Sequence, residues 1–540
     1  MTRLQSELGQ FISLGQYQFA GGFTSQGTVS VAEKRIAANG SAGIENFQLS
    51  SKEKGSISEP KADMTFALNY NRQNELLSIQ SIQSTTGFGR FGVKDAVVPF
   101  RKDLTASMNA TIQASNVDLA KLKPFAVMFG SLPKDTLLAG IADSEMKVTL
   151  ENETYHIVTD KTNIKNIEFG YPGKKPFIQP NTSVAADISL NPTDYTYKGK
   201  LTLLAGQIKM ILNISKQNKD NQKSELKGTA ELDYDWQALS AVTGQFLPED
   251  LTLTGKQSDK ISFTSEYPQG QTDKMLSNLN ASGAVGFQSA DYMGLDFGPT
   301  DVDIVVKNGL LKIDPFSTTV NDGQFDFAAQ ADFMVQPTVF KIPAPMHIIK
   351  EIRINDVTTQ KLLKYINPIF ADAANVNGIA DLSCEALSIP LSDAAKNKAE
   401  IVGTFSVNQL RLETSDVLSQ ILTVVGGSPR GTVITIHPTR FVLRDGFLKY
   451  DDMQMDIGDN PVNFEGVIGL DKSLEMSVTL PYTTEGRTIR IGSTSTNRIT
   501  LPITGTVDHP KLDLKKLLEN QAKQELENQI RKGLENIFNR

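Results

Sequence analysis

The stretch DIVVKNGLLKIDPF at residues 303–316, continued by VNDGQFDFAAQADF at 320–333, decides the fold class. Apolar residues recur in it at every second position, as a strand with one buried face requires. The alternation stops at Asn308-Gly309 and again at Asp322-Gly323, dipeptides that favour tight turns between antiparallel strands. The stretch therefore predicts three antiparallel strands joined by two turns.

The same pattern returns at residues 440–464, where Gly446, Leu448 and Phe464 align without a gap with Gly309, Leu311 and Phe327. Two shorter phrases also recur: Ile44-Glu-Asn-Phe-Gln-Leu49 resembles Ile164-Lys-Asn-Ile-Glu-Phe169, and Gly140-Ile-Ala-Asp143 returns as Gly378-Ile-Ala-Asp381. Repetition at a period of roughly 120 residues indicates stacked copies of one unit, a few strands followed by a short helix and more strands.

Four segments carry apolar residues at the three- and four-residue spacing of short amphipathic helices, within 119–127, 236–242, 362–369 and 417–425. A longer segment of this kind ends the chain. The pattern predicts leading strands over 1–43, four β-groove units over 44–163, 164–280, 281–400 and 401–510, and an amphipathic helix over 511–540. The predicted fold class is mainly β, an elongated, curved antiparallel sheet of repeated units with short connecting helices.

Composition excludes several classes of function. The chain has 54 basic and 61 acidic residues, so it lacks the positive charge that neutralises phosphates, and no nucleic-acid partner is expected. The lone cysteine, Cys384, cannot form an internal disulfide, and the four scattered histidines lack metal-ligand spacing. We expect neither a metal nor a cofactor. The sequence shows no signal peptide and no apolar run of membrane-spanning length.

Two motifs invite a catalytic interpretation. Gly87-Phe-Gly-Arg-Phe-Gly92 matches the dinucleotide-binding pattern, which requires a helix after the glycines, but Val93-Lys-Asp-Ala-Val-Val98 favours a strand. His437 and His509 each precede a proline, and no nucleophile pattern accompanies them. We therefore expect no catalytic residue and a protein that is not an enzyme.

The alternating strands supply the candidate functional residues. In one interpretation their apolar faces pair into sealed sandwich cores. In the other they face a shared groove that is open to lipid chains, since a large exposed apolar strip needs an occupant. The groove candidates are Met64, Phe66, Leu68, Ile208, Met210, Leu212, Ile304, Val306, Leu311, Ile313, Phe325, Phe327, Leu448, Met455, Phe464 and Val478.

The phrase KNGLLKIDPF at 307–316, its continuation GQFDF at 323–327 and the closing LPITGTVDHPKLD at 501–513 resemble the carboxy-terminal region of AsmA-family proteins. That family is related to TamB-like proteins and to bridge-like lipid-transfer proteins built from β-groove units. The resemblance covers residues 280–520, and the earlier half resembles the family through the repeat pattern. It implies a non-enzymatic protein of a Gram-negative envelope that carries phospholipids or other lipids toward the outer membrane.

Members of this family usually begin with a helix that anchors them in the inner membrane, and this sequence shows none, so we expect a truncated chain. The resemblance implies a periplasmic location, an inner-membrane tether in the full-length form, and contact with membranes at the ends. The resemblance leaves open whether the protein has partner proteins in the envelope. Two alternatives remain: a structural or adhesive β-repeat protein with sealed cores, and a carbohydrate-active β-solenoid enzyme, for which aromatic residues are sparse.

Overall fold

The computed structural model divides the chain into two compact units. Unit 1 comprises Met1–Glu249 and Thr254–Ala284, and unit 2 comprises Asp250–Leu253 and Val285–Arg540. The structure describes residues 17–51, 55–99, 107–128, 132–173, 176–219, 221–243, 247–248, 250–335, 337–371, 373–391, 393–413, 416–425, 432–481 and 498–515.

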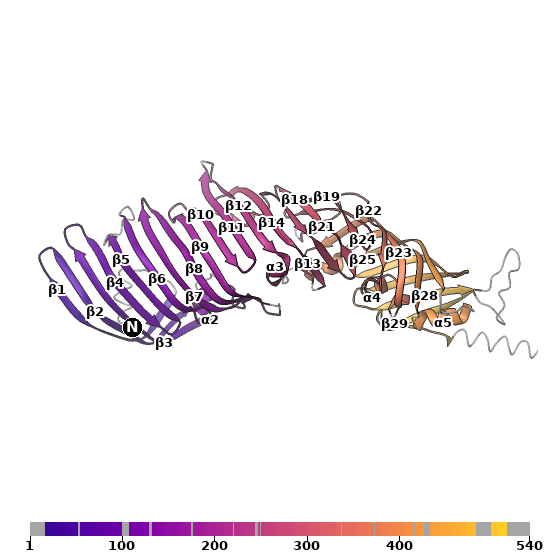
Figure 1. The fold of residues 1–540 in the computed structure, drawn as a ribbon, viewed down its shortest axis with the longest axis horizontal. Coiled ribbons are helices and arrows are strands. Elements are labelled where there is room, and N and C mark those ends of the chain that lie inside the picture. Colours follow the sequence, from indigo (N-terminus) through magenta and orange to yellow (C-terminus); the bar gives the residue numbers. More distant parts are fainter. Residues whose placement is uncertain are drawn as a thin grey trace, which may run out of the picture. The chain divides into compact units, whose positions relative to one another are not determined.

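Unit 1 is an antiparallel sheet in which each strand from β1 to β12 pairs with the next strand along the chain, and β12 pairs with β14 (Figure 1). Its strands are β1 (Tyr17–Val31), β2 (Arg35–Ser51), β3 (Gly55–Asn71), β4 (Leu76–Thr86), β5 (Gly89–Pro99), β6 (Met108–Asp118), β7 (Leu137–Glu151), β8 (Thr154–Gly170), β9 (Phe177–Asn191), β10 (Thr196–Ala205), β11 (Ile208–Lys219), β12 (Lys223–Asp235) and β14 (Lys256–Pro268). Two short helices, α2 (Leu119–Met128) and α3 (Trp236–Thr243), follow β6 and β12, and the 3-10 turn η1 (Thr272–Lys274) follows β14. The division between the units falls within β15 (Leu279–Phe287).

Unit 2 repeats the antiparallel pattern with shorter strands and more helical turns. Its strands are β13 (Leu251–Thr254), most of which belongs here, β16 (Ser289–Tyr292), β17 (Leu295–Phe297), β18 (Thr300–Lys307), β19 (Leu310–Val320), β20 (Gly323–Asp332), β21 (Val339–Lys341), β22 (Met346–Ile354), β23 (Ala374–Pro390), β24 (Glu400–Glu413), β25 (Val433–Arg444), β26 (Phe447–Ile457), β27 (Asn460–Gly469), β28 (Leu474–Pro481), β29 (Arg498–Gly505) and β30 (Pro510–Leu512). The helical elements are α4 (Asp356–Lys361), η2 (Leu363–Tyr365), η3 (Pro368–Phe370), η4 (Asp393–Lys398) and α5 (Asp416–Val425).

The strands bend at bulges that share one arrangement in both units. A residue with positive φ precedes an apolar residue, and both lie opposite a glycine on the neighbouring strand. At Gly140 a Cβ atom would lie 3.1 Å from the Cα atom of Ile167, beside Asn166 with φ 49°. The same arrangement joins Gly21 to Asn46, Gly89 to Asn116, Gly323 to Glu351 and Gly378 to Gln409.

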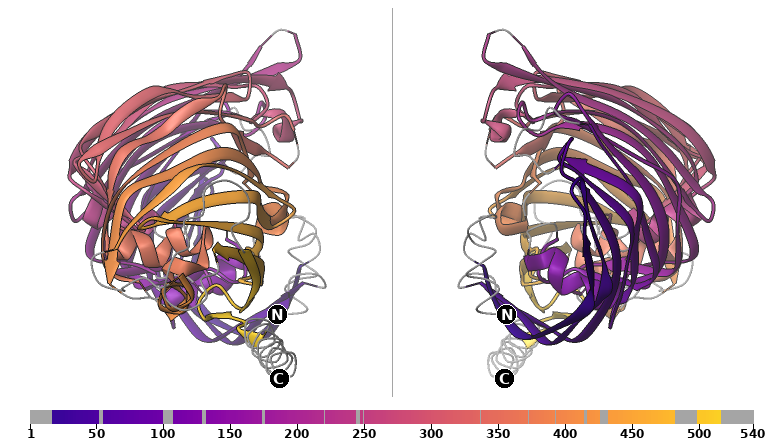
Figure 2. Two further views of the ribbon diagram at one scale, coloured as in Figure 1. Left: turned by 90° about the vertical axis from the view of Figure 1, so that its right-hand side faces the viewer. Right: turned by 90° about the vertical axis from the view of Figure 1, so that its left-hand side faces the viewer.

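These bulges explain the sequence repeats and the curvature. The recurring phrases that begin at Ile44 and Ile164 each place an asparagine at the positive-φ position, a conformation that asparagine tolerates better than most residues. A bulge bends its strand and increases its twist. Curled strands with a concave side result in each unit (Figure 2).

The predicted fold class, mainly β with a curved antiparallel sheet and short helices, is confirmed. Helices form within 119–128, 236–243 and 416–425, as predicted. Residues 362–369 do not form the predicted helix: α4 ends at Lys361, and two 3-10 turns follow. The predicted terminal helix does not begin at Lys511, because Lys511 and Leu512 belong to β30, and its remainder from 516 onward lies outside the described residues.

Candidate functional site

The strands of unit 1 align their apolar residues in rows that run across the sheet. Strand register makes this possible, because partners that face each other on neighbouring antiparallel strands share one face. One row crosses ten strands from β3 to β12 through Met64, Ser84, Phe91, Ala114, Ser144, Thr162, Val184, Leu203, Met210 and Leu232. The candidates Met64 and Met210, far apart in sequence, therefore lie in a single row.

Neighbouring rows complete this surface, which we call the apolar face of unit 1. One row begins at Phe66 and continues through Ile82, Val93, Ile112 and Met146. Leu212 belongs to a row with Thr159, Ala186, Leu201, Ala230 and Ile261. A further row contains Ala110, Val148, Ile157, Ile188, Gly199, Ile214, Gly228, Phe263 and Ala281.

Glycines within the apolar face make room for large side chains of the next strand. Phe263 lies opposite Gly228, where a Cβ atom would lie 2.5 Å from the ring atom Cζ of Phe263. Phe66 lies in the same way opposite Gly40. The large side chains thus lie flat over neighbouring backbone, which keeps the face smooth along the rows.

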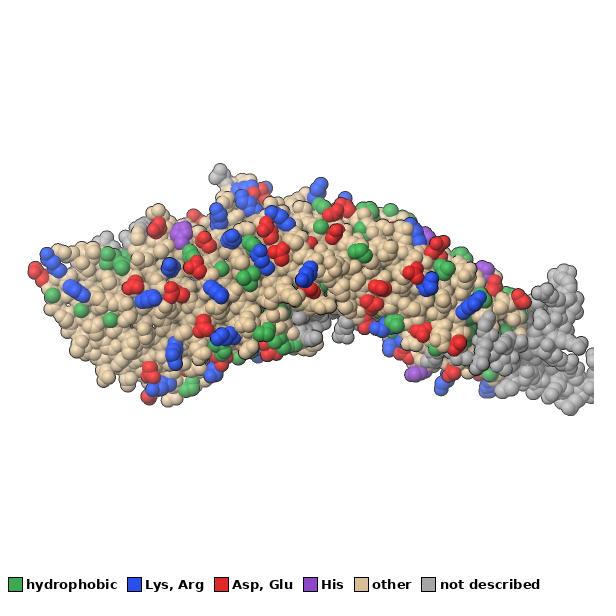
Figure 3. Space-filling model, viewed as in Figure 1, with side chains coloured by type: hydrophobic (Ala, Val, Ile, Leu, Met, Phe, Trp, Pro, Cys, Tyr) green, Lys and Arg blue, Asp and Glu red, His purple; other side chains and the backbone are tan. Residues whose placement is uncertain are grey.

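The opposite face of unit 1 is polar. Ion pairs join neighbouring strands there, with Nζ to carboxylate oxygen distances of 3.4 Å for Lys209 and Asp233 and 2.8 Å for Lys260 and Glu231. Charged side chains of both signs are scattered over the surface shown in Figure 3. Each strand therefore separates an apolar from a solvated face, as its alternating sequence predicts.

The apolar face stays partly exposed in the described residues of unit 1. Met64, Phe66, Leu68, Met210 and Leu212 are half-buried, whereas Ile208 is buried. At one border, Met128 of α2 packs with Leu49 and Ile57. At another, the perpendicular rings of Trp236 in α3 and Tyr234 make a T-shaped, edge-to-face contact, with centroids 5.1 Å apart.

Two acidic side chains of unit 1 are held by local partners. Tyr234 donates a hydrogen bond of 2.6 Å to Asp259, whose strand position pairs with Leu232 of the apolar face. Desolvation raises the pKa of the Tyr234 hydroxyl, so that it stays a donor. Glu59, which is buried, accepts a hydrogen bond of 2.7 Å from the backbone N–H of Gly87. Each carboxylate therefore accepts a hydrogen bond from a donor within the protein.

In unit 2, four candidates share rows that include small residues. Ile304, Ile313 and Ala329 form one row, and Val306, Leu311 and Ala331 form the next. Val306 is buried, and the other three candidates are half-buried. The register thus brings Ile304, Val306, Leu311 and Ile313 together.

Phe325 and Phe327 belong to a cluster of five phenylalanines that we call the phenylalanine cluster. Their rings stack at a centroid distance of 5.7 Å. Phe297, Phe316 and Phe340 pack around them at 5.2 to 6.3 Å. Sequence reasoning missed these three. The position of Phe316 opposite Phe327 depends on a register shift at Asp314-Pro315. All five rings are half-buried, and Phe297, Phe325 and Phe327 pack against a larger core.

Three further candidates, which we expected to line an open groove, belong to that core instead. Met455, Phe464 and Val478 have no exposed surface and lie in a closed cluster with Leu418, Ile421 and Leu422 of α5. Leu448 packs against the cluster from its margin. Met455, Phe464 and Val478 therefore do not line an open groove, because a helical layer covers this part of the sheet.

The sequence motifs with catalytic interpretations occupy strands and turns. Gly89–Pro99 forms β5, so no helix follows the glycines at 87–92. His437 pairs with Asp456 at 2.6 Å and His347 with Asp381 at 3.5 Å, both on partly exposed strand surfaces. Within the described parts of the chain, no group of three His, Cys, Asp or Glu residues could hold a metal ion.

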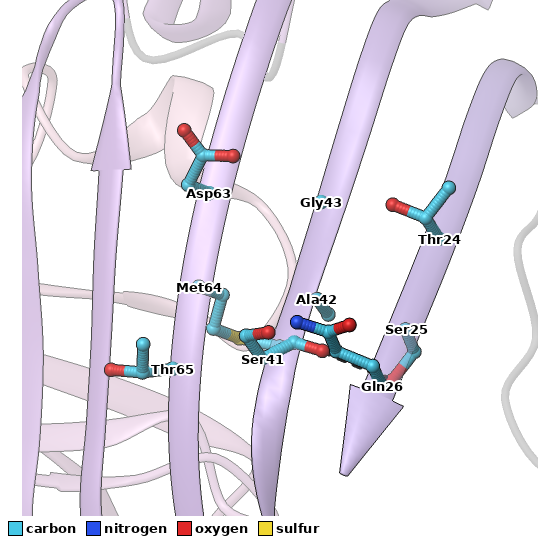
Figure 4. Close-up of a pocket in the computed structure, with 9 residues that line it drawn as sticks. All are labelled: Thr24, Ser25, Gln26, Ser41, Ala42, Gly43, Asp63, Met64 and Thr65. Atoms are coloured by element: carbon cyan, nitrogen blue, oxygen red, sulfur yellow. Dashed lines mark hydrogen bonds between the residues drawn. The ribbon is translucent and has the colours of Figure 1, made fainter.

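Two hollows in the surface are polar. One, of about 380 Å³, lies over β1, β2 and β3, where the side chains of Thr24 and Asp63 flank Gly43 (Figure 4). Another, of about 840 Å³, lies in unit 2 beside His347, Lys350 and Asp381. Both are broad and open, unlike the enclosed, mostly apolar pockets that bind small molecules tightly.

The chain was compared with family models, curated proteins and solved structures, and none of them matches it. None of the helices among the described residues is long and apolar enough to span a bilayer. The class of protein that the fold defines is a mainly β protein with a curved antiparallel sheet, which in unit 1 has one apolar and one polar face.

Proposed function

We propose that the protein is a non-enzymatic lipid carrier whose apolar face in unit 1 holds the acyl chains of phospholipids or related membrane lipids. The observation that carries the proposal is the alignment of half-buried apolar side chains in rows that together cross the strands from β3 to β14. Burial of each acyl methylene contributes roughly 0.8 kcal/mol, so one chain lying along a row would be held firmly.

The location and the role follow from the resemblance to the AsmA family in residues 280–520. We infer an envelope protein of a Gram-negative bacterium, located in the periplasm and tethered to the inner membrane in its full-length form, that serves phospholipid transport and outer-membrane biogenesis. The charged face suits an aqueous compartment, and the apolar face suits a ligand that water excludes.

The structural or adhesive alternative has one observation in its favour. Unit 2 has a closed core beneath α5, as a protein with sealed sandwich cores would have. This alternative predicts a lipid-free protein and weak binding of hydrophobic dyes, because no large apolar surface would then be accessible.

The test is native mass spectrometry of the purified full chain, followed by lipid extraction from the same sample. We expect co-purified phospholipid, with a reduced amount in Leu212→Asn. The matched control is Ile211→Asn, since Ile211 is also half-buried but faces the other side of β11, opposite Glu231. A lipid-free wild-type protein, or equal lipid content in the two variants, would reject the proposal.

A further inference from the structure

The first strand of unit 1 carries the apolar face to an edge of the sheet. Phe23, Val29 and Val31 of β1 lie opposite Ile44, Ala38 and Ile36 of β2. Those β2 residues in turn lie opposite Ala62, Leu68 and Tyr70 of β3, in the row positions that flank Met64 and Phe66. The three β1 side chains thus share the apolar face with these candidates.

These three side chains are exposed, whereas Met64, Phe66 and Leu68 of β3 are half-buried. Their exposed fractions are 43% for Phe23, 68% for Val29 and 64% for Val31. In the part of the chain that the structure describes, residues 22–31 pair with β2 on one side, and β1 is the outermost strand of unit 1 (Figure 1). An added strand at this edge would bury all three side chains.

Three of the usual protections against pairing are missing from this edge. Natural sheets protect an edge strand with lysine, with proline or by keeping it short. The 15 residues of β1, YQFAGGFTSQGTVSV, contain neither a charged residue nor a proline. The backbone of residues 22–31 is therefore suited to accept a further strand.

We propose that β1 pairs with β1 of a second copy of this chain, antiparallel about a two-fold axis at Gly27. A two-fold axis brings residues near the axis close to their own copies, so charged residues there would repel each other. The absence of charge from β1 makes it compatible with its own copy. In this register Phe23 faces Val31 of the second copy, Ser25 faces Val29, and Gln26 faces Thr28.

The pairing would join two apolar faces into one. Phe23 opposite Val31 is an aromatic and β-branched pair of the kind that stabilises antiparallel strands. A single strand pair is a small interface, so the dimer should form at high protein concentration and dissociate on dilution. The inference concerns the edge of the sheet and holds whether or not lipid binds.

The test is sedimentation velocity of the full chain over a concentration series. The double variant Gln26→Lys with Thr28→Lys places lysines opposite lysines on the polar face of β1. We expect the dissociation constant of the dimer to rise on the order of tenfold. The double variant Gln26→Glu with Thr28→Lys places opposite charges across the axis, and we expect it to dimerise at least as well as the wild type at low salt.

The outcomes separate this inference from the proposed function. Gln26 and Thr28 lie on the polar face, so lipid content should stay at the wild-type level in both double variants. A protein that is monomeric at all concentrations would overturn the inference. A dimer that the two lysines leave unchanged would overturn it as well, because the copies would then meet elsewhere. Circular dichroism of each variant checks that it is folded.

Discussion

The carboxylate of Asp143 accepts a hydrogen bond of 2.7 Å from the backbone N–H of Asn116, the positive-φ residue of a bulge on the neighbouring strand. Asp381 accepts one of 3.1 Å from the N–H of Glu351 in the same way. Each aspartate ends the repeated phrase Gly-Ile-Ala-Asp, whose glycine, Gly140 or Gly378, lies against a bulge of the strand on the other side. One four-residue phrase thus supports two bulges.

This arrangement predicts that Asp143→Ala destabilises unit 1. The variant leaves the N–H of Asn116 without its carboxylate, and because the pair is partly exposed we expect a loss of about 1 kcal/mol. Asp381→Ala should have a similar effect in unit 2. Urea unfolding followed by circular dichroism measures both losses. The control is Asp143→Asn, which keeps an acceptor oxygen and should lose less; equal losses in the alanine and asparagine variants would argue against the hydrogen bond as the cause.

The close contact between Gly228 and Phe263 predicts that Gly228→Ala is destabilising by about 1 to 3 kcal/mol. Its new Cβ atom would lie 2.5 Å from both the ring of Phe263 and the carbonyl oxygen of Asn213. Gly92→Ala is the matched control on β5, since the nearest atom to its Cβ would be 3.7 Å away. Thermal unfolding of both variants provides the comparison. A Gly228→Ala protein as stable as Gly92→Ala would show that the two strands move apart easily.

Much of the fold could be predicted from alternation, because a period of two residues specifies strands and their faces. The recurring phrases were visible in the sequence, but their role was not. Asn46 and Asn166 align as repeats, yet only the strand register shows that both residues form bulges opposite a glycine. Bulges depend on pairing between strands, which a single strand sequence does not contain.

The candidate site shows the same limit. Alternation assigned Met64 and Phe464 to the same kind of face, and both do lie on apolar faces. Whether such a face is open depends on what packs over it, and Phe464 is covered through contacts with segments distant in sequence. A strand pattern therefore predicts the face correctly and leaves its accessibility open.

The difference between the open face and the closed core predicts opposite results for two truncations. Phe464→Ala removes a ring with no exposed surface and should cost about 3 to 5 kcal/mol of unfolding free energy while lipid content stays unchanged. Leu212→Ala removes a half-buried side chain, so we expect a loss of roughly 1 kcal/mol with reduced lipid content. Urea unfolding and lipid extraction on the same preparations test both. Reduced lipid in Phe464→Ala alone would place the ligand in unit 2.

An acid-sensitive contact in unit 2 provides the last prediction. Asp508 pairs with Lys364 of η2 and, at 2.7 Å, with Lys472 of the turn before β28. Hydrogen bonds from these two lysines lower the pKa of Asp508 to about 2, against about 3.9 in an unfolded chain. The stabilisation is therefore complete above pH 4 and is lost as the pH falls toward 2.

Asp508→Asn should consequently cost up to about 1 kcal/mol at pH 7. The difference from the wild type should shrink between pH 4 and pH 2, as the wild-type carboxylate takes up its proton. Urea unfolding at pH 7, 4 and 3 measures the trend. Lys364→Met serves as the reciprocal variant, and its effect should not add fully to that of Asp508→Asn, because both remove the same contact. A difference that stays constant from pH 7 to pH 3 would show that the ion pair does not stabilise the fold.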